Sequence, residues 1–200
     1  MSNLVNYPKI AQTNATTHKQ NDEGKMPRLS YIHNHGTEPL VYMTIGNLIE
    51  RAADKYGQIE AIVSISENRR ITYRDILHEA DKLAAGFHRL GLRKGDKIGL
   101  WAPNVAEWVI VFFAATRIGL ITVTINPKYQ APELRHVLNI CEVKALVCLD
   151  EYKSLNFYGI LLNLVPQLEK AETKSFSSEN LPTLKIIITI SKATLRYRNL

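Results

Sequence analysis

Residues 97–149 read KIGLWAPNVAEWVIVFFAATRIGLITVTINPKYQAPELRHVLNICEVKALVCL, and this stretch decides the fold. It holds three short apolar runs, which are Lys97–Trp101, Ile121–Ile125 and Ala145–Leu149. Runs of this length, rich in Val, Ile and Leu and bounded by Gly, Pro or Asn, are typical of strands. Longer segments with helical spacing separate them. Strands that alternate with helices predict an α/β fold, with a mostly parallel sheet flanked by helices.

The two connecting helices have recognisable ends. Asn104 is expected to cap the first, which carries Glu107 in its first turn and stops at Gly119. Pro132 suits the first turn of the second, which is expected to run through Leu138. Because crossovers between parallel strands are right-handed, these connections fix most of the topology.

Upstream, the same reasoning predicts two helices and a hairpin. Thr44 is expected to cap a helix that stops at Gly57, and Thr72 with Asp75 resembles the capping box of a second helix that ends at Gly91. The hairpin is expected to turn at Glu67-Asn68 between two β-prone runs, Ala61–Ile65 and Arg70–Thr72.

Downstream, a helix over Ser154–Leu168, a surface loop over residues 169–183 and a strand over Lys185–Ile190 complete the pattern. The first forty residues are rich in Asn, Thr, Gln, Lys and Pro and predict a loosely ordered arm. The expected division is therefore an arm over residues 1–40, a domain over 41–190 and a basic tail over 191–200.

Composition excludes several classes of protein. With 200 residues, 46% of them hydrophobic and 22% charged, the chain suits one globular domain with tails. The net charge of +6 is spread along the chain, apart from a concentration after Glu179. Nucleic-acid binding would require a denser basic stripe with interleaved aromatic residues, so a solvated tail is favoured.

Localisation signals are weak. Met1–Gln20 has neither the apolar core of a secretory signal nor the arginines of a mitochondrial transit peptide. Trp108–Thr116, the longest apolar stretch, has nine residues where a membrane span needs about twenty, so a buried helix is expected. Cys141 and Cys148 match no disulfide framework or zinc pattern, and two reduced core cysteines fit an intracellular protein.

No constellation of reactive residues stands out, and we assign no catalytic, cofactor-binding or metal site. His33 and His35 lack a third ligand nearby, and the helical histidines at 78, 88 and 136 are expected on solvated faces. Neither G-x-G-x-x-G nor G-x-x-x-x-G-K-[ST] occurs, so Gly95 and Gly99 are expected to serve in turns and packing. Asn126 and Tyr129 indicate a structural turn, with substrate contact as the minor alternative.

Three patches nevertheless carry a resemblance to a known family. They are ITYRDILHEADKLAAGFHRLGLRKGDKIGLWAPN (71–104), FFAATRIGLITVTINPKYQAPEL (112–134) and KALVCL (144–149). They resemble the N-terminal domain of AMP-forming acyl-CoA synthetases of the adenylate-forming superfamily. NPKYQAPELRHVL together with SYIHNHGTEPL looks most like the medium-chain acyl-CoA ligase branch, which is mitochondrial, although a cytosolic location stays open.

The resemblance implies a reaction and its cofactors. Such enzymes activate a carboxylic acid with ATP and Mg²⁺ to an acyl-adenylate, and then transfer the acyl group to coenzyme A. The family's phosphate-binding loop, ribose-binding Asp and catalytic Lys would follow the position of Leu200, so none can be placed here. The chain is accordingly expected to be an N-terminal portion that binds none of these cofactors alone and has no activity alone.

Two other hypotheses remain. The chain could be a non-catalytic short isoform or interaction module that binds a full-length synthetase, which a pull-down would reveal. An unrelated α/β nucleotide-binding module is less favoured, because NPKYQAPELRHVL would then be a coincidence. If a second subdomain normally covers this one, the uncovered apolar surface is expected to drive self-association. No transmembrane segment or nucleic-acid partner is expected.

Overall fold

The fold is described by a computed structural model that places residue 36 and residues 40–169, 178–190 and 195–198. The chain divides into two units, Met1–Leu40 and Val41–Leu200, and the elements below belong to the second. The expected N-terminal arm, including His33 and His35, lies almost entirely outside the described residues.

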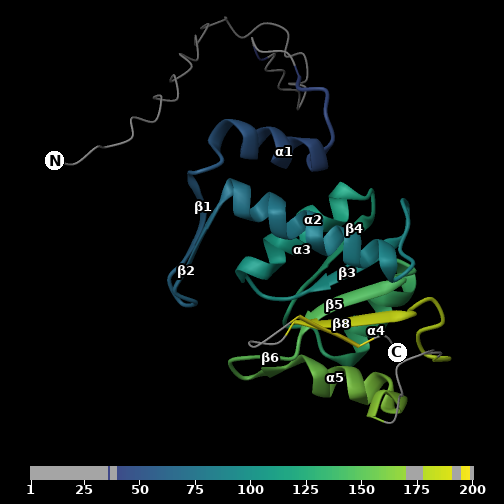
Figure 1. The fold of residues 1–200 in the computed structure, drawn as a ribbon. Helices are drawn as coiled ribbons and strands as arrows, with labels where there is room; N and C mark the ends of the chain where they lie inside the picture. The colour runs from purple at the N-terminus through teal and green to yellow at the C-terminus, as the bar shows by residue number, and fades with distance from the viewer. Residues whose placement is uncertain (1–35, 37–39, 170–177, 191–194, 199–200) are drawn as a thin grey trace, which may run out of the picture. The chain divides into compact units, whose positions relative to one another are not determined.

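One five-stranded sheet organises the second unit (Figure 1). Its strand order is β4-β3-β5-β8-β9; the first four strands are parallel and β9 is antiparallel to β8. The bounds are β3 (Lys97–Trp101), β4 (Ile121–Ile125), β5 (Ala145–Leu149), β8 (Ile186–Ile190) and β9 (Leu195–Arg198). The predicted α/β class and mostly parallel sheet are confirmed, and three strands match their predicted bounds to the residue.

Helices cover both faces of this sheet (Figure 1). On one side lie α1 (Ile45–Tyr56), α2 (Tyr73–Arg89) and α3 (Ala106–Arg117); on the other lie α4 (Ala131–Ile140) and α5 (Phe157–Leu164). The chain steps outward from β3 to β4 and then back past β3 to β5. Crossovers of one hand therefore place α3 and α4 on opposite faces.

Strands β3 and β5 pack closely together in the core. Gly99 in β3 permits this packing, because a Cβ atom there would lie 3.0 Å from Leu146 Cδ1 and 3.2 Å from Ile125 Cδ1. The buried ring of Trp101 meets Phe157 edge-on, with 4.7 Å between ring centroids. Gly95 has φ +89°, so the expected turn and packing roles of the two glycines are both confirmed.

The predicted caps of the first two helices are confirmed. The Thr44 hydroxyl accepts a hydrogen bond from the Asn47 N–H at 3.2 Å. Thr72 and Asp75 form a reciprocal capping box at the start of α2, which follows the antiparallel hairpin of β1 (Glu60–Ser64) and β2 (Arg69–Thr72). Hydrogen bonds from the Thr72 hydroxyl and N–H lower the pKa of the Asp75 carboxyl.

The predicted cap of α3 is wrong. Val105 occupies the N-cap position in place of Asn104 and offers no side-chain hydrogen bond. The Ala106 N–H instead donates at 3.3 Å to the carboxylate of Glu67, which lies in the β1–β2 turn. A residue distant in the sequence therefore satisfies a backbone donor that a local pattern assigned to Asn104.

The helix predicted over Ser154–Leu168 is only partly correct. A small hairpin, β6 (Glu151–Tyr152) with β7 (Leu155–Asn156), precedes α5. The Asn156 side chain caps α5 by accepting from the Gly159 N–H at 2.7 Å. The helix stops at Leu164 because Pro166 has no N–H to continue it, and a 3₁₀ turn, Pro166–Glu169, follows.

Strand β9 was not predicted. It lies within the expected basic tail, and its backbone pairs with β8 from Ile187 opposite Arg198 to Ile190 opposite Leu195.

Arg117 ties the three helices of one face together. From the end of α3, its guanidinium donates to Asp81 of α2 at 2.7 Å and to Glu50 of α1 at 2.7 Å. It also reaches the Gly46 carbonyl at 3.1 Å. A side chain at Gly46 would place its Cβ 2.9 Å from the Thr116 carbonyl oxygen, so α1 approaches α3 closely there. These carboxylates raise the pKa of Arg117.

We expect Arg117→Met to lower the free energy of unfolding by about 1–2 kcal/mol, because charged hydrogen bonds to a half-buried guanidinium are lost while the apolar stem is kept. Lys82→Met is the matched control, since it breaks an exposed pair with Glu79 on α2. Its expected cost is below about 0.5 kcal/mol. Urea unfolding followed by circular dichroism measures both, and equal losses would contradict the account.

The capping box predicts a pH dependence. Because the folded pKa of Asp75 is lowered, its carboxylate stabilises the fold above the unfolded value, near 3.9, and this contribution disappears as pH falls through the folded pKa. Thr72→Ala is therefore expected to cost about 1 kcal/mol at neutral pH and progressively less in acid. Thr44→Ala is the control, because α1 has no acidic residue in its first turn. Parallel pH profiles for the two variants would refute the prediction.

Candidate functional site

The carboxyl ends of the parallel strands define the candidate site. The chain leaves β3 toward β4 on one side and later returns to β5 on the other, so the order switches direction between β3 and β5. In open α/β sheets, ligands bind beyond the carboxyl ends at such a switch point. The site is therefore expected where Trp101 and Leu149 end their strands.

A hollow of about 520 Å³ lies at this edge. Its floor is apolar and comes from Val105, Leu149 and Ile190, which are all buried. Its remaining lining is mostly charged or polar and consists of Ser66, Glu67, Arg69, Glu107, Glu151, Tyr152 and Lys153. An apolar floor under a polar rim can hold the apolar part of a small ligand while its polar groups stay near the rim.

The β1–β2 hairpin forms one wall of the hollow. Glu67 at its turn accepts from the Ala106 N–H, and Arg69 pairs with Glu107 in the first turn of α3. Both contacts hold the hairpin against the start of this helix. Sequence reasoning missed Glu67 and Arg69, because the pattern around Glu67-Asn68 indicates only a turn and carries no signal of the helix it contacts.

The charges at the rim are of both signs. Lys153 lies over the ring of Tyr152, with its Nζ 5.3 Å from the centroid. Within the ranges that the structure covers, no group of three His, Cys, Asp or Glu side chains could hold a metal ion. The hollow thus offers an apolar surface beneath charges of both signs.

Asn126 and Tyr129 do not line this hollow. The Asn126 side-chain oxygen accepts from the Lys128 N–H at 3.0 Å, and the Asn126 backbone carbonyl accepts from the indole N–H of Trp101 at 3.1 Å. Tyr129 is half-buried against the core. The interpretation as a structural turn, which tethers β4 to β3, therefore fits their contacts.

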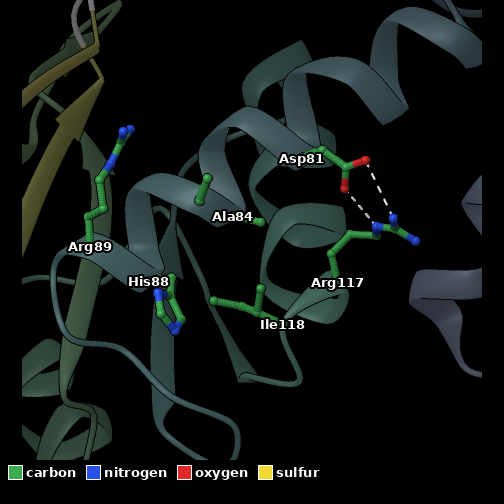
Figure 2. A pocket seen from close by; sticks show the side chains of 7 residues that line it. Asp81, Ala84, His88, Arg89, Arg117 and Ile118 are labelled. Atoms are coloured by element: carbon green, nitrogen blue, oxygen red, sulfur yellow. Dashed lines mark hydrogen bonds and ion pairs between the residues drawn. The ribbon is translucent and has the colours of Figure 1, made fainter.

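An open depression of about 590 Å³ lies between α2 and the end of α3 (Figure 2). It is lined by Asp81, Ala84, Ala85, His88, Arg89, Arg117 and Ile118. Figure 2 shows the Asp81 carboxylate directed at the Arg117 guanidinium, so these two charges neutralise each other. His88 is exposed, as are His78 and His136, which confirms the predicted solvated faces.

Neither cysteine forms a disulfide. Burial, with the negative charge of Asp150 nearby, raises the pKa of the Cys148 thiol to about 12. Cys148 therefore stays protonated and acts as a small apolar side chain, as the strand pattern predicts. Trp108–Thr116 lies within α3, and none of the described helices has the length and hydropathy to cross a membrane.

The family of AMP-binding enzymes matches residues 49–196. Over 162 residues the chain is 39% identical to the mitochondrial medium-chain acyl-CoA ligase ACSF2 of Rattus norvegicus, an alignment that covers 81% of this chain and 26% of that protein. The chain thus spans about a quarter of the length of this relative.

Solved structures agree on the fold. The anthranilate CoA ligase AuaEII, in complex with anthranoyl-AMP, superposes with a TM-score of 0.60 at 26% identity, over 79% of this chain and 27% of that one. A fatty acyl CoA synthetase of Mycobacterium tuberculosis superposes with a TM-score of 0.62 at 23% identity, over 76% of this chain and 27% of that one. This chain belongs to the AMP-binding enzyme family and has the N-terminal fold of its AMP-forming acyl-CoA synthetases.

Proposed function

We propose that the chain supplies the N-terminal part of an acyl-CoA ligase that acts on a medium-chain fatty acid. The observation that carries this proposal is the 39% identity to a medium-chain ligase over 81% of the chain. In this reaction the carboxylate attacks the α-phosphorus of ATP, pyrophosphate leaves, and the coenzyme A thiol then displaces AMP from the acyl-adenylate.

The contribution of these residues is a scaffold. Acid activation needs backbone donors, a cation and Mg²⁺ directed at the phosphates, because negative charge develops there in the transition state. The sequence of 200 residues contains no glycine-rich phosphate loop, and the hollow at the carboxyl edge has no array of glycine N–H groups. We therefore infer that ATP, Mg²⁺ and coenzyme A bind only in the presence of further residues, and that the chain alone does not turn over.

Location and association follow from the same proposal. The relatives that are medium-chain ligases are named as mitochondrial, which supports a mitochondrial location for this chain. Exposed apolar side chains around the start of α1, such as Val41, Tyr42 and Leu48, support association with another protein surface. Self-association itself stays a prediction.

A chimera tests the scaffold role. Residues 41–190 replace the aligned segment of the rat ligase, and pyrophosphate release is measured with octanoate, ATP and coenzyme A. We expect the chimera to be active and the isolated 200-residue chain to be inactive. The control is the same chimera with Gly99→Leu, whose side chain has no room beside Leu146 and Ile125 and should abolish activity.

Two results would contradict the proposal. A chimera that folds and melts cooperatively but releases no pyrophosphate would show that these residues do not serve such a ligase. Robust turnover by the isolated chain would show that these 200 residues contain the catalytic groups, and not a scaffold alone.

A further inference from the structure

Strand β4 lies at an edge of the five-stranded sheet, and among the residues that the structure places it pairs with β3 alone. Two of its side chains are exposed, Ile121 (51%) and Thr124, whereas the inner strands β5 and β8 are buried throughout. Natural edge strands are usually protected by charges, prolines or bulges. The strand sequence ITVTI contains no charge and no proline, and its register with β3 is regular.

The outward hydrogen-bonding groups of β4 belong to its two threonines. The Ile121 N–H donates to the Asp96 carbonyl at 2.9 Å, on the β3 side. Because residues alternate along a parallel ladder, Val123 and Ile125 also face β3, and the N–H and C=O groups of Thr122 and Thr124 face away. Among the described residues, no backbone partner is found for these four groups.

The strand is also a palindrome, since ITVTI reads the same in both directions. In an antiparallel pair of two copies centred on Val123, Ile121 faces Ile125, and Thr122 faces Thr124. The two threonines that face each other are the ones whose backbone groups point outward, so each pair can exchange two hydrogen bonds. Matched β-branched pairs of this kind stabilise neighbouring strands.

The flanking residues allow this pairing and limit its length. Leu120 would lie opposite Asn126 of the second copy, so no like charges meet. Strand β4 itself ends at Ile125, which limits the ladder to this segment. The edge is therefore self-complementary over the five residues of β4.

We propose that β4 is a self-recognition edge: two copies of this chain pair through antiparallel Ile121–Ile125 strands about a two-fold axis at Val123. The contact is isologous, because the same strand serves both copies. The two sheets then form one continuous sheet, and the outward groups of Thr122 and Thr124 gain partners.

This arrangement predicts specific distances between the copies. The two Val123 residues form a non-hydrogen-bonded pair with Cα atoms about 4.5 Å apart, which is within the range of a disulfide. The two Ile121 residues lie four positions out of register, roughly 13 Å apart at 3.4 Å per residue. Only the first pair can therefore be cross-linked.

Mild oxidation of variants with one accessible cysteine tests the register, since the remaining native thiol of Cys148 is buried. In a Cys141→Ser background, we expect Val123→Cys to form a covalent dimer and Ile121→Cys to stay monomeric. Ile121 is the matched control, because random collisions would favour the more exposed thiol. The inference is overturned if Val123→Cys gives no covalent dimer or if both variants cross-link equally.

A second pair of variants tests the hydrogen bonds. Thr124→Pro removes an outward N–H that β3 does not use, whereas Thr124→Val keeps both the N–H and the β-branched shape. Light scattering over a concentration series is expected to show loss of the dimer only for Thr124→Pro, with the melting transition retained. A dimer that survives this proline, or that is lost equally in both variants, would also overturn the proposal.

Discussion

The structure depends on the burial of β5 between β3 and β8, with helices on both faces. All five residues of Ala145–Leu149 are buried, and the strand is hydrogen-bonded to a parallel neighbour on each side. A strand in this position must be apolar throughout, because no face meets water. Two contacts of β3 fix the elements around β5. Gly99 lets β3 lie close to the Leu146 side chain of β5, and the Trp101 ring packs against Phe157 of α5.

This burial also explains how much could be predicted from the sequence. Continuous apolar runs and the caps at Thr44 and Thr72 are local signals, and they located the inner strands and the first helices correctly. Contacts between distant residues left no such signal. Glu67 replaces Asn104 as the partner of the α3 N-terminus, and a hairpin over residues 151–156 takes the place of a helical turn.

The candidate site shows the same division between local and distant signals. Parallel strands place their carboxyl ends at one edge, so the position of the hollow follows from topology. The wall of the hollow cannot be predicted from topology, because Arg69 and Glu107 meet only through the docking of the β1–β2 hairpin on α3. An apolar floor bounded by paired charges fits the scaffold role proposed above.

Native-state hydrogen exchange tests the central claim, that a sheet buried around β5 holds this chain together. The amides of Leu146 and Val147 are expected to exchange only through global unfolding, while those of the β6–β7 hairpin are expected to exchange through local opening. Exchange of the β5 amides as fast as that of Tyr152 and Leu155 would contradict it.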